Sequence, residues 1–394
     1  MTQQQKQNLS IFLGAVVIIG GLTWAYETYQ SKKIADAAWP TLDGGVYASA
    51  VTRNGVSSLI PGDELYKSGV VEGGIPSLTN PKYASVLASD AVIADELFGI
   101  DLAIGGDHRF YPVQVMNWHE VVNDTIDGKD VAITYCPLCG TGVVYNRAVD
   151  AIEGEEDQED TDGKTLLTFS VTGKVYNNNT VLKDDQTGSL WLQATGESIQ
   201  GSMIGKTLEV IPSRMMAWKD WKAMYPSGFV LSTNTGITRD YTRHPYGNYD
   251  TSKGVYFPLN HMDPNFGSKW VVYGVSEGEN GLGFSEIALK GTGMMHAKLG
   301  EKDVIAVYDF ATDTAHVFET KSQNGDVHTF TYDYAKKLLL DEQKGIWNGV
   351  TGVDMLSSSM NSLIEVPVIR GFWFCLAAMH PTWKAVLTNE PVTP

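Results

Sequence analysis

The chain has 394 residues, long enough for one or two domains with a large hydrophobic core. Its 46 acidic and 29 basic residues give a formal net charge of −17, and the lack of a basic stripe excludes the nucleic-acid backbone as a partner. Three cysteines are too few for a disulfide scaffold, but they allow one disulfide, one metal site or three unreactive thiols.

The N-terminal segment, residues 1–33, contains an uncharged apolar run from Ile11 to Tyr26. The run is slightly short for a membrane span unless the two residues before it are included. Trp24 and Tyr26 suit a membrane interface. We therefore expect an uncleaved, single-pass membrane anchor, with a cleaved signal sequence and a soluble buried helix as the alternatives.

Residues 34–100 form a segment that is rich in loop-forming residues up to about position 80 and has helical spacing of apolar residues over 84–97. A second helix is expected after Pro112, because proline suits the first turn of a helix. Val115, Trp118 and His119 share one face of that helix. His119 is then either a hydrogen-bonded core histidine or a ligand or proton carrier beside the core.

The two central cysteines lie in Cys136-Pro137-Leu138-Cys139, between two β-branched runs, which predicts a strand, a tight turn and a second strand. Two thiolates at this spacing can bind zinc or copper, with histidine as a further ligand. His119 is the best candidate for that ligand, and His244 is a more distant one. Cys375 lies in an apolar run and is expected to be a buried thiol with a packing role only.

Two other interpretations of the thiol pair remain open. Cys136 and Cys139 could form a structural disulfide, or they could carry out thiol–disulfide exchange. Exchange of the thioredoxin type normally places the first cysteine at a helix N-terminus, which lowers its pKa. The residues after Cys139 instead resemble a strand, which weakens this hypothesis without removing it.

The chain also resembles itself, which predicts two duplicated modules at 101–232 and 285–394, joined by a connection over 233–284. Under this pairing the thiol-bearing turn lies opposite Asp309-Phe310-Ala311-Thr312, so the second copy makes the same turn without cysteines. The expected fold is α+β with mainly antiparallel strands, and each module packs a Trp-bearing helix, around 214–225 and 370–379, onto its sheet.

The connection contains a segment, residues 238–250, that is dense in Arg, Tyr and His. It is a candidate ligand cleft for a carboxylate or phosphate group. The alternative is a loop held by tyrosine hydrogen bonds and Arg–Asp pairs. The candidate cleft residues are Arg239, Tyr241, Arg243, His244 and Tyr246.

Several of these motifs occur together, in an order that resembles a bacterial and archaeal family known as domain of unknown function 3179. The resemblance covers most of residues 90–385 and implies an exported or membrane-anchored protein, hence a C-terminal domain outside the cytoplasm. The acidic insert at 151–162, expected to be a solvated loop, departs from that family. The motifs are Tyr111-Pro112, Trp118 to Asp124, Thr134 to Cys139, Thr187 to Trp191 and Arg239 to Asp250.

The sequence thus supports three classes of function. The first is a membrane-anchored extracytoplasmic protein with a copper or zinc site at Cys136, Cys139 and His119. The second is a structural or accessory module of a membrane assembly, with a membrane-protein partner or a small ligand and a Cys136–Cys139 disulfide. The third is a thiol–disulfide redox protein. No nucleophile elbow, phosphate loop or dinucleotide fingerprint occurs, so the sequence leaves open whether the protein is an enzyme.

Overall fold

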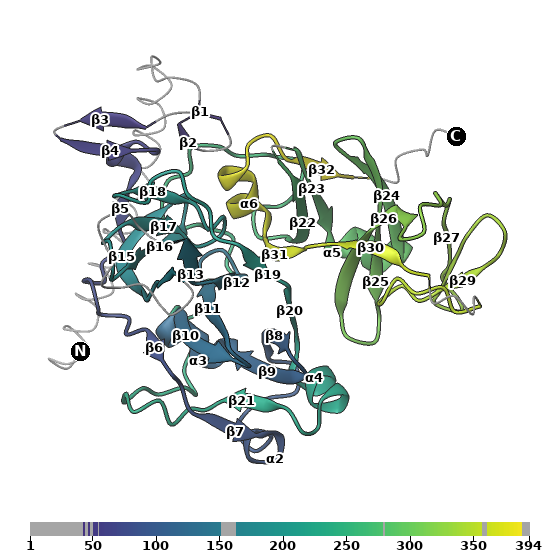
Figure 1. Cartoon of the computed structure of the whole chain (residues 1–394), viewed down its shortest axis with the longest axis horizontal. Coiled ribbons are helices and arrows are strands. Elements are labelled where there is room, and N and C mark those ends of the chain that lie inside the picture. The colour runs from purple at the N-terminus through teal and green to yellow at the C-terminus, as the bar shows by residue number, and fades with distance from the viewer. Residues whose placement is uncertain are drawn as a thin grey trace, which may run out of the picture. The chain divides into compact units, whose positions relative to one another are not determined.

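The computed structural model describes residues 42–43, 46–47, 50–53, 55–150, 163–278, 280–356 and 361–387 (Figure 1). The predicted membrane anchor at 1–33 and the acidic insert at 151–162 lie outside these residues. Within the described part of the chain, no helix combines the length and the apolar character needed to cross a membrane. The described residues from Asp43 onward belong to one unit.

The fold is mostly antiparallel β-sheet with a few short helices, which confirms the predicted class. The helices of the described residues are η1 (Gly62–Glu64), α2 (Val86–Ser89), α3 (Val113–His119), α4 (Trp218–Met224), α5 (Glu286–Thr292) and α6 (Trp373–Met379). The helix predicted over 84–97 is only the single turn of α2, and turns follow it before strand β8 begins at Phe98. The helix expected after Pro112 is α3, and the two Trp-bearing helices are α4 and α6.

One sheet of the N-terminal half carries the thiol-bearing turn. Its order is β19-β12-β11-β10-β6, with bounds β6 (Leu78–Thr79), β10 (Val121–Ile126), β11 (Lys129–Cys136), β12 (Thr141–Asn146) and β19 (Val210–Ile211). The side chains of β11 alternate between two hydrophobic clusters, with Ile133 and Tyr135 in one and Ala132 in the other. Both faces of the strand are therefore covered, which explains its almost uninterrupted apolar sequence.

A second sheet places a run of asparagines against that turn. Its order is β3-β4-β18-β17-β16-β15-β5, with bounds β3 (Val51–Arg53), β4 (Val56–Ser58), β5 (Tyr66–Lys67), β15 (Phe169–Tyr176), β16 (Asn179–Asp184), β17 (Leu190–Leu192) and β18 (Ser198–Gln200). Asn177 and Asn178 join β15 to β16 with positive φ angles of 49° and 65°. Two such residues make the tight hairpin turn that asparagine favours.

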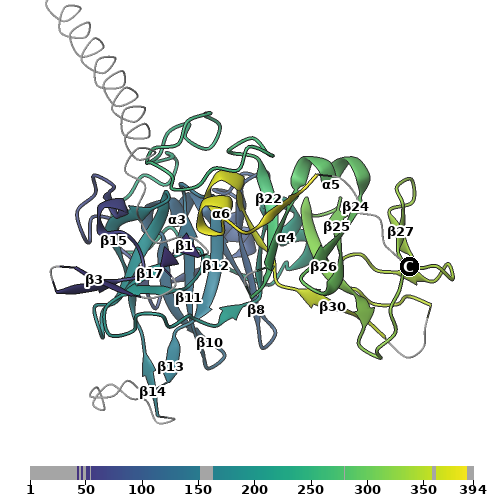
Figure 2. The same cartoon turned by 90° about the horizontal axis from the view of Figure 1, so that it is seen from above.

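The remaining strands of the N-terminal half form a sheet of order β20-β8-β9-β21-β7, a hairpin, and two short strands at the start of the described residues. Their bounds are β7 (Tyr83–Ser85), β8 (Phe98–Ile104), β9 (Asp107–Pro112), β20 (Ser213–Ala217), β21 (Phe229–Leu231), β13 (Ala148–Asp150), β14 (Lys164–Leu166), β1 (Leu42–Asp43) and β2 (Val46–Tyr47). The hairpin of β13 and β14 projects away from the sheets (Figure 2).

The C-terminal half contains three further sheets, of order β31-β22-β23-β32, β24-β25-β26-β30 and β27-β28-β29. Their bounds are β22 (Val271–Glu277), β23 (Asn280–Ser285), β24 (Met294–Leu299), β25 (Lys302–Asp309), β26 (Thr314–Ser322), β27 (Thr331–Asp333), β28 (Leu338–Leu340), β29 (Ile346–Trp347), β30 (Leu363–Val366), β31 (Ile369–Phe372) and β32 (Lys384–Val386). Strand β22 and most of strand β23 lie within the predicted connection over 233–284. Strand β22 pairs with β31, so these two strands belong to a sheet of the C-terminal half.

The order of elements in the two halves is similar. In the N-terminal half, the hairpin β8–β9 leads into α3 and then into β10, β11 and β12, and the later elements β20, α4 and β21 complete the sheet of the hairpin. In the C-terminal half, the hairpin β22–β23 leads into α5 and then into β24, β25 and β26, and the later elements β31, α6 and β32 complete the sheet of the hairpin. The thiol-bearing turn is closed by the pair Cys136 and Thr141, and the turn after β25 by the pair Asp309 and Thr314. The two turns therefore have the same length and the same register.

Candidate thiol–disulfide site

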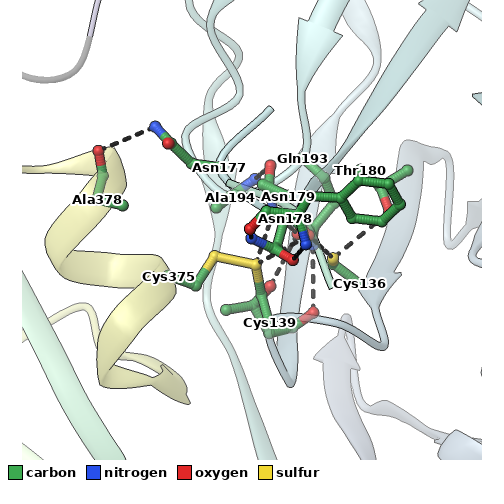
Figure 3. The surroundings of a disulfide bond; sticks show 12 residues. Cys136, Cys139, Asn177, Asn178, Asn179, Thr180, Gln193, Ala194, Cys375 and Ala378 are labelled. Carbon is green, nitrogen blue, oxygen red and sulfur yellow. Dashed lines mark hydrogen bonds between the residues drawn. A yellow bond between two sulfur atoms is a disulfide. The ribbon is translucent and has the colours of Figure 1, made fainter. Parts of the chain in front are cut away.

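The disulfide of the described chain joins Cys139 to Cys375, with 5.5 Å between their Cα atoms. Cys139 belongs to the turn between β11 and β12, whereas Cys375 lies in the first half of α6 (Figure 3). This corrects two expectations. Cys139 is not paired with Cys136, and Cys375 is not a thiol with only a packing role. The physical reason is that the end of β31 lies against the turn between β11 and β12, where the Phe372 amide donates to the Cys139 carbonyl at 2.8 Å. Helix α6 begins at the next residue, so Cys375 lies close to Cys139.

Two glycines allow this close approach. A side chain at Gly371 would come within 2.5 Å of Thr141 Cγ2 and 3.3 Å of the Cys139 carbonyl oxygen. Gly140 has a φ of 62°, a left-handed conformation that glycine adopts without the usual steric cost, and a side chain there would press on the Phe372 ring at 3.2 Å. The chain can therefore bring α6 against the turn only with small residues at these points.

Cys136 is a buried thiol outside any disulfide. Its Sγ lies 3.5 Å from the Asn178 carbonyl oxygen, and Cys139 Sγ lies 3.5 Å from the same oxygen. The Cys136 thiol can donate a proton to this carbonyl, while Cys139 has no thiol proton because its sulfur is in the disulfide. The Cys136 and Cys139 sulfurs therefore both contact the same carbonyl oxygen, that of Asn178.

The asparagine turn holds the sulfurs from the second sheet. The Asn179 side-chain amide lies 3.6 Å from Cys139 Sγ and donates to Gln193 Oε1 at 3.0 Å. The Asn177 amide donates to the Ala378 carbonyl in α6 at 3.2 Å. Asn178 exchanges two hydrogen bonds of 2.8 Å with the backbone of Phe257. These bonds fix the turn against α6 (Figure 3). They also fix it against the loop that contains Phe257.

A buried carboxyl group, that of Glu120, is linked to Cys136 through the side chain of Thr180. The Thr180 hydroxyl donates to Glu120 Oε2 at 2.9 Å and lies 3.4 Å from Cys136 Sγ. The Tyr246 hydroxyl donates to Glu120 Oε1 at 2.6 Å. Burial raises the pKa of Glu120 to about 7, although both hydrogen bonds oppose the shift. Burial, and then the charge of Glu120, raise the pKa of the Cys136 thiol to about 11.

His119 is fully buried, but its ring is turned toward other groups. One ring nitrogen lies 2.7 Å from the Pro76 carbonyl oxygen and the other 2.7 Å from the Tyr241 hydroxyl. None of these partners is among the groups that contact Cys136. Among the described residues, no set of three or more His, Cys, Asp or Glu side chains is arranged to hold a metal ion. The structure therefore does not bring His119 together with the two cysteines.

The candidate cleft at 238–250 is attached to the end of α3. Three consecutive residues at that helix end, Trp118, His119 and Glu120, each contact the segment. The Trp118 indole donates to the Arg243 carbonyl at 3.2 Å, and the other two residues meet Tyr241 and Tyr246. The Arg239 guanidinium lies 5.9 Å from the Trp118 ring centre, and His244 is exposed. Of the five predicted cleft residues, only Tyr246 forms a hydrogen bond with Glu120, the buried carboxyl group near Cys136.

Sequence reasoning missed Glu120, Thr180, the asparagine turn and the role of Cys375. The asparagine turn had a signal, because consecutive asparagines between two β-branched runs are typical of a tight hairpin. Glu120 had none, because a single glutamate between a histidine and two valines does not reveal that it is buried.

Comparison with known proteins places this site inside a recognised family region. A family model described as "Protein of unknown function (DUF3179)" matches residues 72–383, a range that contains all three cysteines and Glu120. No curated protein and no solved structure matches the chain.

Proposed function

This chain belongs to the family of unknown function matched over residues 72–383, and we propose that it is an extracytoplasmic thiol–disulfide switch protein. The observation that carries the proposal is the buried Cys136 thiol, which shares the Asn178 carbonyl with one sulfur of the Cys139–Cys375 disulfide. A thiol next to a disulfide is the arrangement that intramolecular exchange needs.

The exchange step balances without an external oxidant. The Cys136 thiolate attacks Cys139 Sγ, the Cys136–Cys139 bond forms, the Cys139–Cys375 bond breaks, and Cys375 leaves as a thiolate that takes up a proton. The raised pKa of Cys136 makes its thiolate rare at neutral pH. The Thr180 hydroxyl and Glu120 offer the nearest path for the proton that Cys136 must lose. The two disulfide isomers then correspond to the observed bond and to the bond suggested by the Cys-X-X-Cys spacing.

The location follows from the same chemistry. Disulfides persist in oxidising compartments outside the cytoplasm, and the uncharged run from Ile11 to Tyr26 suits a membrane anchor. We propose that the described residues lie outside the cytoplasm, held to the membrane by this run, where a membrane protein could be the partner. Proteolysis of intact cells or spheroplasts tests this: external protease should degrade the described domain, and protection from it would contradict the proposal.

We also infer that the two halves are copies of one module. The support is the matching order of elements and the matching turns at Cys136 and Asp309. In the second turn the Thr312 hydroxyl donates to Asp309, at the positions equivalent to Cys139 and Cys136. A scaffold that forms this turn without thiols leaves Cys136 and Cys139 available for chemistry. Superposition of the halves in an experimental structure is the check, and a different path of the chain in one half would contradict it.

Disulfide mapping tests the switch. The purified full-length chain is held at pH 7 to 10 without reductant, quenched in acid, alkylated and mapped by mass spectrometry. We expect a fraction with a Cys136–Cys139 bond and an alkylated Cys375, because deprotonation of Cys136 starts the exchange. Cys136→Ser should never alkylate at Cys375.

Two variants at one position report on the proton path. Thr180→Val removes the hydroxyl between Cys136 and Glu120 and should slow the exchange, whereas Thr180→Ser keeps the hydroxyl and should not. If wild-type Cys375 stays unmodified throughout the pH range, the disulfide is only a structural crosslink. The interpretation as an accessory module would then replace the switch.

A further inference from the structure

One long segment without regular structure packs over the three cysteines. Residues 232–270, all of them described, join β21 to β22 without a helix or a strand. Loops longer than about 15 residues are uncommon in compact domains and often act as lids. We call residues 241–270 the strap. The strap side chains that belong to the hydrophobic cluster of the three cysteines, or pack against it, are Tyr246, Tyr249, Val255, Phe257 and Leu259.

The strap is attached to the same residues that surround Cys136. The Tyr246 hydroxyl donates to Glu120 at 2.6 Å. The backbone of Phe257 exchanges two hydrogen bonds of 2.8 Å with the Asn178 side chain, and the Asn178 carbonyl oxygen contacts Cys136 Sγ. Because Cys136 is fully buried beneath these contacts, a reagent in solution reaches its thiol only when part of this covering moves away.

A lysine near the end of the strap holds the middle of the strap in place. Lys269 Nζ donates to the Tyr249 carbonyl, donates to Ser252 Oγ at 3.1 Å and lies 3.3 Å from the centre of the Tyr249 ring. Burial lowers the pKa of Lys269 to about 8, so the group is mostly charged at pH 7. Hydrogen bonds from a charged donor are stronger than neutral ones.

The end of the strap is fixed on the helix that carries Cys375. The carbonyl groups of Ser268 and Trp270 accept the amides of Phe374 and Trp373, at 2.8 and 2.9 Å. These are the first amides of α6, which have no acceptor within the helix. The lysine therefore connects a part of the strap that is anchored on α6 to the part that covers the thiol.

Two buried polar atoms of the strap favour its opening. The Tyr249 hydroxyl and Asn260 Oδ1 have no hydrogen-bond partner within the part of the chain that the structure describes. A buried polar atom without a partner destabilises the closed state, and opening returns it to water. Segments with such weak points open locally while the sheets beneath them stay folded.

We propose that the strap is a lid, held closed by Lys269, whose local opening admits the thiol of a partner protein to Cys136. The lid rests on the proposed switch for its role, because it controls access to the same site. Its opening is nevertheless measured without any exchange of the disulfide.

Alkylation of the native full-length chain at pH 7 tests the lid. N-ethylmaleimide labels the single free thiol, and mass spectrometry counts the label on Cys136 and Cys375 together, so that exchange does not affect the result. Lys269→Met keeps the length of the side chain but removes the donor, and it should speed labelling about tenfold. Lys253→Met is the matched control, because Lys253 is an exposed lysine of the same strap, and its rate should equal that of wild type.

Urea separates local opening from global unfolding, and this comparison needs no variant. Local opening exposes little surface, so the labelling rate of the wild type should rise only slightly with urea below the unfolding transition. A rate that follows global unfolding from the lowest urea concentration would overturn the lid. Equal labelling rates in wild type and a folded Lys269→Met protein would also overturn it.

Hydrogen exchange distinguishes failure of the lid from failure of the switch. The amides of Phe257 and Asn260 donate to the side chains of Asn178 and Asn177, at 2.8 and 2.9 Å, so they report on the strap without using a thiol. They should exchange about tenfold faster in Lys269→Met and at the wild-type rate in Lys253→Met. Unchanged exchange in Lys269→Met rejects the lid, whereas an unmodified Cys375 in the disulfide mapping rejects only the switch.

Discussion

Glu120 shows how a single residue is made unusual by its position. It follows the last turn of α3 in a left-handed conformation, with φ of 56°, and its carboxyl group is buried between Tyr246 and Thr180. Few non-glycine residues adopt this conformation. The carboxyl group receives two hydrogen bonds, but they do not compensate fully for the loss of water, so its pKa is raised to about 7.

The raised pKa predicts a pH-dependent effect of Glu120→Gln. Between about pH 4.5 and 7, unfolding exposes Glu120 to water and releases its proton, so wild-type stability falls as the pH rises. Glutamine cannot ionise. We expect the variant to gain about 3 kcal/mol over wild type above pH 7, and almost nothing below pH 4.5. Urea unfolding over this pH range measures it.

Glu209→Gln is the matched control, because Glu209 is exposed to water. It should not reproduce the pH-dependent gain. A difference between Glu120→Gln and wild type that stays constant from pH 4 to pH 8 would contradict the assigned burial effect.

At the scale of elements, both halves close a tight turn with an aspartate that accepts a tryptophan indole. Trp191 donates to Asp184 at 2.8 Å, and Trp347 donates to Asp341 at 3.0 Å. Asp184 is fully buried and also accepts the Thr187 amide at 2.6 Å, whereas Asp341 is partly exposed. The same indole–aspartate hydrogen bond thus occurs in both halves, with a more deeply buried aspartate in the N-terminal half.

This pair predicts unequal costs for the same substitution. Asp184→Ala leaves buried donors on Trp191 and Thr187 without an acceptor, and each such group costs roughly 1–3 kcal/mol. We expect a loss of about 3 kcal/mol or more for Asp184→Ala. The loss for Asp341→Ala should be smaller, because the loop residues that follow Asp341 are exposed to water. Urea unfolding of the two variants is the measurement, and equal losses would contradict the explanation from burial.

At the scale of the whole molecule, the disulfide joins residues separated by 236 positions in the sequence. A crosslink across so long a loop restricts the unfolded chain strongly, and loop entropy is the main source of its stabilisation. A Cys136–Cys139 bond would close only a short loop and would leave α6 without its covalent tie. The two isomers should therefore differ in global stability.

Cys375→Ala should lower the free energy of unfolding by about 3–5 kcal/mol. Wild-type protein treated with a phosphine reductant should show a similar loss, because it lacks the same crosslink. Chemical unfolding of both samples provides the comparison. If the oxidised and reduced wild-type proteins unfold at the same urea concentration, the disulfide has no stabilising role of this size.

Several features were predictable because they depend on neighbours in the sequence. The strand, turn and strand around Cys136 follow from β-branched runs on each side of a proline and a glycine. The α3 start after Pro112 and the Trp-bearing helices follow from local patterns as well. The mainly antiparallel class follows from many short strands separated by turn residues.

Other features depended on contacts between segments that are far apart in the sequence. Hydrophobic periodicity shows which face of a strand is buried, but not which helix covers it. The sequence by itself determined a turn with two thiols and a histidine nearby on a helix. Only the tertiary structure decided that Cys139 pairs with Cys375, that His119 faces Tyr241, and that Glu120 is buried beside Cys136. The physical reason is that contacts between residues far apart in the chain depend on the packing of whole sheets and helices, which local sequence does not encode.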